Sequence, residues 1–253
     1  MTSAKTNTRI RRVLLIASAF AWILIIFNPG NLLPMEHGSA GRPGMSRVSF
    51  RMLLVMNPVV STIANWGVMV VAMMFPLLMA PVSYMYRCSL KRRRFRAASL
   101  FVLAYTGTWI AAGLAMLPAM VALKLLLPQP WLPALTVGIA TLVWQWSPLR
   151  QQCLNRGHEY RPLTAFGRAA DRDASLFGVS HAAWCVGSGW AIMLFPMTLP
   201  TGHIPAMILV TFLMASEHLE APRVPRWRLS ARRKLMRLLF AQSEIRLKQS
   251  LGK

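Results

Sequence analysis

The sequence predicts an all-α protein, a polytopic membrane bundle of about six transmembrane helices with both termini in the cytoplasm. Three observations predict it. Long stretches of the chain contain no Lys, Arg, Asp or Glu, and the cations gather in the short segments between them. Hydrophobic residues make up 55% of the 253 residues, whereas Asp and Glu together number only 7.

The charge-free stretches place the predicted helices in order along the chain. Each of the first five is long enough for a helix of about 20 residues, which crosses about 30 Å of hydrocarbon. The sixth needs Glu217 to complete its crossing, because its charge-free stretch is shorter. The stretch Met52–Tyr86 is too long for one span, so we expect Pro58 to separate a lead-in from the helix itself. The predicted spans lie near residues 13–34, 64–86, 98–120, 129–148, 177–199 and 204–221.

The cations fix the orientation of these spans. Of the 29 Lys and Arg residues, 25 lie in alternate connecting segments, namely 1–12, 87–96, 147–176 and the part from 222 onward. Segments rich in Lys and Arg stay at the cytoplasmic face, which places the protein N-in and C-in as a multi-pass protein of the bacterial inner membrane. Residues 1–221 are therefore predicted to form the transmembrane domain.

Residues 222–253 are predicted to form a basic cytoplasmic tail. Apolar residues recur in it every three to seven positions, as on one face of an interfacial amphipathic helix. Two interpretations of the tail stay open, a lipid-bound anchor and a docking element for a protein partner. The formal charge of +22 lies beside membrane spans, which favours anionic lipids as partners and not nucleic acid.

The cysteines indicate thiols and not disulfides. Cys88 and Cys153 fall in predicted cytoplasmic segments, and Cys185 falls within the fifth span, so none faces the oxidising side. Cys153 and His158 are five residues apart in the inner segment, a spacing that is weak support for a metal site and more often belongs to two unconnected side chains.

The fifth and sixth spans contain the most suggestive polar groups. His181 and Cys185 are four residues apart and so share a helical face. A short connection favours antiparallel packing with the sixth span, where Glu217 lies at a similar depth. We therefore expect His181, Cys185 and Glu217 to converge on one inward-facing cavity. They either bind a metal ion, or His181 and Glu217 only satisfy each other.

Methionine is unusually frequent, with 17 residues, of which Met73 and Met74 are adjacent in the second span. Thioether, thiolate and imidazole ligands together select Cu(I) over harder ions. Methionine is also an ordinary filler of apolar cores. Adjacent residues on a helix point in different directions, so at most one of this pair is expected to face a shared site.

Several segments, read together, resemble one protein family. They are Trp66-Gly-Val-Met-Val-Val-Ala-Met-Met-Phe-Pro76, Trp144-Gln-Trp-Ser-Pro-Leu-Arg followed by Cys153-Leu, His181-Ala-Ala-Trp-Cys185-Val-Gly with Trp190-Ala-Ile-Met, and Glu217. They are similar, in order, to segments of the bacterial predicted metal-binding integral membrane proteins that include the polyphenol-oxidase-type membrane copper chaperone. The resemblance covers roughly residues 64–219.

The resemblance implies copper handling, with loading of a partner such as a copper-dependent oxidase and no turnover of a small substrate. Family members commonly have further cysteines after the positions matching Cys153 and Cys185, and this chain lacks them. The implied Cu(I) site is therefore a mixed one, built from Cys185, His181, Met73 or Met74, and Glu217.

Other functional classes stay open at this point. One is a metal-free membrane subunit or scaffold of a larger complex, and another is a small transporter, for which prolines within the spans are a weak indication. An enzyme is not predicted, because the chain has no phosphate-cradling glycine motif, nucleophile elbow or His-Glu-x-x-His pattern.

Overall fold

The apolar stretches of the sequence fold into helices, and the part of the chain that the structure describes contains no strand. The structure is a computed structural model and describes residues 2–27, 59–127, 129–164, 166–220, 222 and 224–227. Pro58 and nearly all of the predicted basic tail lie outside the described residues. The helices that coincide with the predicted spans are α1 (Thr2–Phe27), α4 (Val59–Met74) with α5 (Met79–Cys88), α6 (Arg94–Leu126), α7 (Leu132–Trp146), α9 (Gly167–Thr198) and α10 (His203–His218).

Three helical stretches are long and apolar enough to cross a membrane: Arg9–Phe27, Ser61–Cys88 and Arg94–Lys124. The other three predicted spans are helical too. However, α7 and α10 have only 15 and 16 residues, about 23 Å of helix each, and α9 begins with charged residues such as Arg168 and Asp171. A crossing by α7, α9 and α10 therefore stays a prediction.

The second span is interrupted at Pro76. A 3-10 helix, η1 (Phe75–Leu78), separates α4 from α5 at this point. Proline has no N–H to continue the α-helical ladder, and its ring clashes with the preceding turn, so the helix tightens here. The interruption ends α4 at Met74, in the middle of the buried core.

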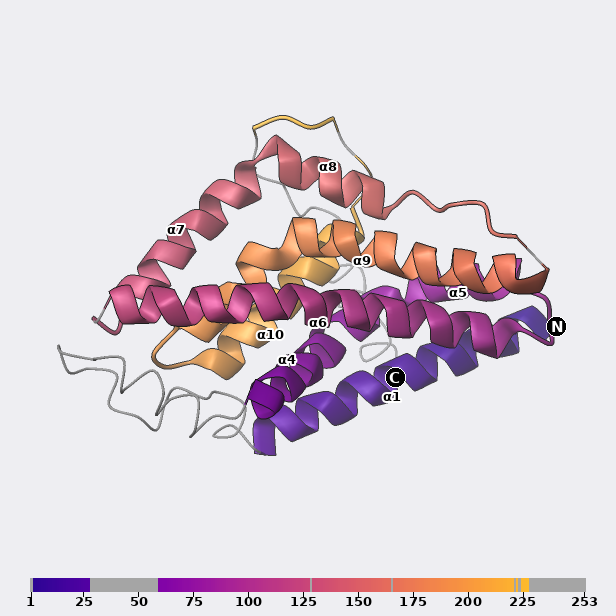
Figure 1. Ribbon diagram of the computed structural model, residues 1–253, viewed down its shortest axis with the longest axis horizontal. Coiled ribbons are helices and arrows are strands. Elements are labelled where there is room, and N and C mark those ends of the chain that lie inside the picture. Colours follow the sequence, from indigo (N-terminus) through magenta and orange to yellow (C-terminus); the bar gives the residue numbers. More distant parts are fainter. Residues whose placement is uncertain are drawn as a thin grey trace, which may run out of the picture.

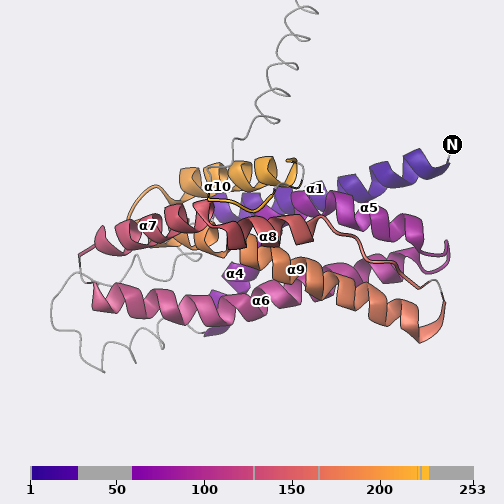
Figure 2. The same ribbon diagram turned by 90° about the horizontal axis from the view of Figure 1, so that it is seen from above.

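Helices α6 and α9 lie side by side along the long axis of the molecule and make its most extensive helix pair (Figure 1). Helix α1 packs along α4 and α5, α10 packs against α9, and α7 leans away from α6 (Figures 1 and 2). A glycine permits the close approach of α6 to α9. A Cβ at Gly178 would lie 2.5 Å from the carbonyl oxygen of Phe101 on α6.

The connection predicted as an inner segment, 147–176, is largely helical. Helix α8 (Pro148–Gly157) packs against α9, and α9 itself begins at Gly167, ten residues before the predicted span. Ser147 caps α8, since its hydroxyl accepts a hydrogen bond from the Leu149 amide at 3.2 Å. This helix brings Arg150 into the protein interior.

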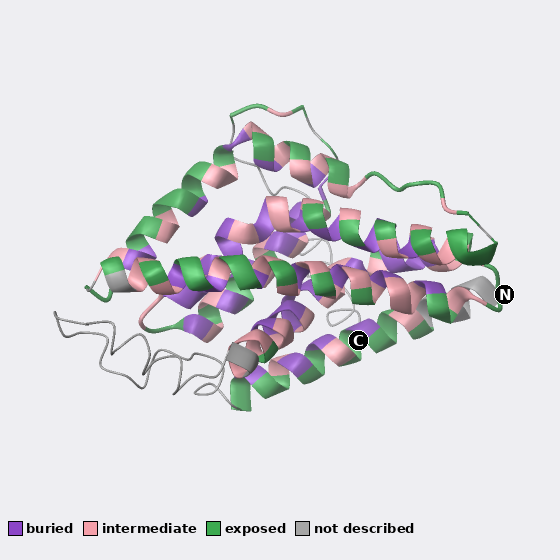
Figure 3. Ribbon diagram, in the orientation of Figure 1, coloured by how far each residue is buried: buried purple, intermediate pink, exposed green. Residues whose placement is uncertain are grey.

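Most of the buried core residues lie on α4, α6 and α9 (Figure 3). They include many methionines and aromatic side chains. Trp66 on α4 donates its indole hydrogen to the carbonyl of Trp109 on α6, at 2.8 Å. Gly113 leaves room for the Trp66 ring, which a Cβ at that position would overlap. The largest fully buried side chains in the described part include Trp66, Trp109, Tyr105, Phe101, Phe177, Met73, Met74, Met193 and Met214.

Replacing Gly178 with alanine tests the close approach of α6 and α9. We expect Gly178→Ala to destabilise the protein by about 1–3 kcal/mol, because the obstructing atom is backbone and cannot rotate away. The measurement is thermal unfolding in detergent. Gly107→Ala is the matched control, because nothing lies within 4 Å of a Cβ there. Equal stability of the two variants would contradict this account of the interface.

Candidate metal centre

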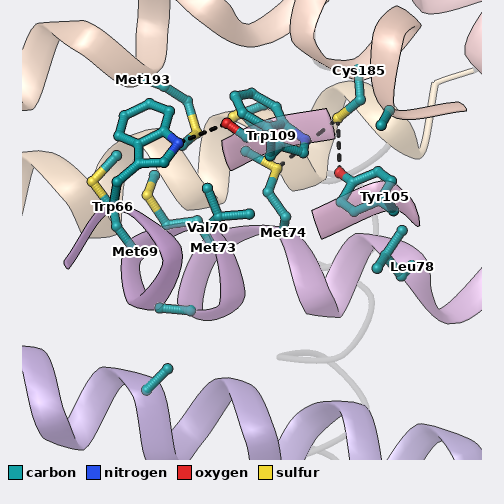
Figure 4. Packing of buried hydrophobic residues seen from close by; sticks show 14 of the residues in the cluster. Trp66, Met69, Val70, Met73, Met74, Leu78, Tyr105, Trp109, Cys185 and Met193 are labelled. Carbon is teal, nitrogen blue, oxygen red and sulfur yellow. Dashed lines mark hydrogen bonds between the residues drawn. The ribbon is translucent and has the colours of Figure 1, made fainter. Parts of the chain in front are cut away.

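Cys185 lies in the middle of α9 and is only 4% exposed. Its Sγ atom is 4.0 Å from the Sδ atom of Met74, which is fully buried at the end of α4. The hydroxyl of Tyr105 on α6 donates a hydrogen bond to the same Sγ atom at 3.2 Å. Three helices thus meet at one sulfur atom (Figure 4).

Trp109 completes the surroundings of the Cys185 sulfur. It lies one turn after Tyr105 on α6, on the same face of the helix. Its indole nitrogen points toward Cys185 (Figure 4) and is buried without a hydrogen-bond partner among the described residues. A buried N–H group without a partner is costly, so an anionic sulfur in front of it would be stabilised.

His181 lies one turn before Cys185 and is also buried. Its ring is surrounded by aromatic rings, with centroids 6.0 Å from those of Phe101 and Tyr105 and 5.9 Å from that of Phe177. Tyr105 therefore contacts both the imidazole of His181 and the sulfur of Cys185.

Glu217 does not join this group. Its carboxylate forms an ion pair with the guanidinium of Arg150, and the two residues are 4% and 1% exposed. The structure does not bring His181, Cys185 and Glu217 together as predicted. The described residues contain no group of three His, Cys, Asp or Glu side chains placed to hold a metal ion. The physical reason is that a buried carboxylate requires a charged partner, and α8 supplies one.

The donors that do meet at Cys185 are soft. A thiolate and a thioether prefer Cu(I), whereas hard ions prefer carboxylate and carbonyl oxygens. The pair is also shielded from water by the helices around it. The residues present therefore fit a monovalent copper ion as cargo.

Comparison with known protein families agrees with this chemistry. A model of the copper chaperone family PpoB2 matches residues 63–232, about two thirds of the chain. The chain belongs to this family. Searches of curated proteins and of solved structures found no significant match. Membership confirms the family resemblance seen in the sequence and makes this chain a member of a family of copper chaperones.

Cys153 of this copper chaperone stands apart from the buried sulfur pair. It lies on α8, where its Sγ atom packs against Gly187 on α9. Burial raises the pKa of the Cys153 thiol, and the nearby charge of Arg156 only partly opposes this. Because the thiolate is the metal ligand, a raised pKa leaves less of the binding form at neutral pH.

His158, five residues from Cys153, is occupied by backbone contacts. Its Nδ1 atom is 2.8 Å from the carbonyl oxygen of Leu154, and its Nε2 atom is 3.1 Å from that of His218. The imidazole thus links α8 to the end of α10. The weak metal-site interpretation of the Cys153 and His158 spacing gains no support, because both ring nitrogens already have partners.

An apolar cavity of about 740 Å³ lies between α7, α9 and α10. Its walls include Leu135, Ile192 and Val210, and none of the cysteine or methionine sulfurs lines it. It is therefore separate from the buried sulfur pair of Cys185 and Met74.

The sequence analysis missed three residues. Tyr105 and Trp109 lie beside Cys185, and Arg150 is the partner of Glu217. A signal existed only for Arg150, because a glutamate within an apolar span needs a cation, and Arg150 lies in the adjoining inner segment. Tyr105 and Trp109 occupy an apolar helix in which aromatic residues are ordinary, so only the packing of α6 against α9 reveals them.

Removing one member of the Arg150–Glu217 pair tests its structural role. Arg150→Met is expected to destabilise the protein by about 3–5 kcal/mol, because it leaves a buried carboxylate without its cation. The double variant Arg150→Met with Glu217→Met is expected to recover most of that loss. Thermal unfolding in detergent measures both.

Arg172→Met is the control for this experiment, since Arg172 is exposed on α9. A double variant that is as unstable as Arg150→Met alone would contradict the pairing.

Proposed function

We propose that this copper chaperone is a six-span protein of the bacterial inner membrane that holds one Cu(I) ion between Cys185 and Met74 and passes it to a partner copper enzyme. The observation that carries the proposal is the buried contact of a thiol and a thioether, 4.0 Å apart. This contact occurs within the region that matches the copper chaperone family.

Charge balance supports a thiolate–Cu(I) pair at this depth. An isolated charge is strongly disfavoured in an apolar interior. One thiolate and one Cu(I) ion together carry no net charge, and the neutral thioether of Met74 adds none. The hydroxyl of Tyr105 and the indole N–H of Trp109 would both donate to the thiolate, replacing the hydration that it loses.

Two of the other predicted ligands belong near this site and two do not. Met73 is buried beside Met74, and His181 is the imidazole one turn away, so both are proposed to assist when the ion enters or leaves. Glu217 is assigned to the ion pair with Arg150. Cys153 is separated from the pair by its place on α8.

The surface of the bundle supports a membrane location. Large apolar side chains are exposed along α1, α7 and α10, a surface that a soluble monomer rarely presents but that lipid would cover. Examples are Phe20, Phe27, Ile139, Leu142, Leu209 and Phe212.

The arrangement of three basic segments supports the predicted orientation. The N-terminus, the connection from α5 to α6 and the start of α9 lie at the same end of the molecule (Figure 1). Arg93 and Arg96 at that end both pair with Asp171, at 3.0 and 2.7 Å. Other cations of these segments, among them Arg9, Arg92 and Arg168, are exposed and would face anionic lipid head groups of the cytoplasmic leaflet.

Copper binding by purified protein tests the function. We expect close to one Cu(I) per chain at the high-affinity site under reducing conditions, lost in Cys185→Ser, because that variant removes the anionic ligand. In Met74→Leu, the affinity is expected to fall at least tenfold, about 1.4 kcal/mol. Competition with a Cu(I)-specific chromophoric chelator gives both quantities.

Cys88→Ser is the control, since Cys88 is an exposed thiol at the end of α5. High-affinity copper binding that survives Cys185→Ser, or is absent from the wild type, would contradict the proposal. The second outcome would favour a metal-free membrane scaffold.

A further inference from the structure

The core around Cys185 and Met74 contains more sulfur than one copper ion needs. Met69 and Met73 on α4 and Met193 on α9 are 5%, 1% and 0% exposed, and they belong to the same buried cluster. Their thioethers extend into the strip between α4 and α9 that also holds Met74 and Cys185 (Figure 4).

Helical spacing explains why these thioethers share one strip. Met69 and Met73 are one turn apart on α4 and so lie on the same face. Met193 follows Cys185 by two turns of α9. Because α4 ends at Met74, the sulfurs continue along the strip from Met74 back toward Met69, away from the interruption at Pro76.

Aromatic rings form the walls of this part of the strip. Trp66 and Trp109 lie with ring centroids 6.2 Å apart and planes inclined by 48°. The indole N–H of Trp66 is held by the carbonyl of Trp109, which fixes the orientation of the Trp66 ring. Tryptophan faces attract cations, most strongly where water is excluded, so a monovalent ion among these thioethers would be favoured by the rings as well.

The chemistry of thioethers restricts which ion can bind there. Methionine sulfur is neutral at every pH, so no proton has to leave when an ion binds. Thioethers are soft ligands, which favour Cu(I) over hard ions such as Mg²⁺. The site suits Cu(I) and its analogue Ag(I).

We propose that Met69, Met73 and Met193 form a second, thioether-only site for Cu(I), next to the site at Cys185 and Met74. The inference rests on the proposed function for the identity of the ion. A neutral ligand set holds Cu(I) more weakly than a thiolate does, so this site is the temporary one. It would receive the ion from Cys185 or deliver the ion to it, without a change in oxidation state or protonation of the methionines.

The number of Ag(I) ions bound per chain tests this inference, using the full chain in detergent and titration calorimetry. The wild type is expected to bind two Ag(I) ions of unequal affinity. Cys185→Ser is expected to lose only the tight one, and Met69→Leu with Met193→Leu only the weak one. Leucine is close to methionine in volume, so folding is preserved, and unchanged thermal unfolding confirms it.

Met85→Leu with Met207→Leu is the matched control, because both are buried methionines on other helices, α5 and α10. This control is expected to retain two ions. One tight ion in the wild type that disappears in Cys185→Ser would overturn the second site while leaving the proposed function intact, since the methionines would then only fill the core. A weak ion that persists in Met69→Leu with Met193→Leu would also overturn it. No tight ion in the wild type would overturn the proposed function itself.

Discussion

The packing of α6 against α9 is the constraint on which the site depends. The two helices approach so closely at Gly178 that no side chain fits between them. This contact fixes the register in which Tyr105 and Trp109 face Cys185, one turn apart on α6. Helix α4 then needs to contribute only long side chains, and Met74 reaches the sulfur from the point where Pro76 ends that helix. The proposed site is therefore positioned by the packing of the helices.

The fold also separates hard donors from soft ones. Arg150 binds the carboxylate of Glu217, and His158 is held between the carbonyl oxygens of α8 and α10. These polar contacts join α8 to α10, whereas the strip between α4 and α9 holds sulfur and aromatic rings. Since a metal site takes its selectivity from the donors within reach, this separation favours a soft ion such as Cu(I) over hard ions. Membership of a copper chaperone family is consistent with that preference.

The positions of the helices could be predicted from the sequence because long apolar stretches without charged residues are typical of helices that cross a bilayer. Cys185 and Met74 could be named as candidates because sulfur within a span is chemically distinctive. The choice between Met73 and Met74 could not be made, since it depends on the break at Pro76 and the rotation of α4. Its depth in the sixth span groups Glu217 with His181 and Cys185, and that grouping gives no sign of Arg150. In the structure α8 folds back onto α9, and this tertiary contact leaves no local pattern in the sequence.

The central claim is that a buried thiolate and thioether hold the copper ion, and X-ray absorption at the copper edge tests it most directly. The sample is the full chain loaded with one equivalent of Cu(I), compared with the same sample of Met74→Leu. We expect a first shell of sulfur only, with one sulfur scatterer lost in the variant. A first shell dominated by nitrogen or oxygen, or a sulfur shell unchanged in Met74→Leu, would contradict it.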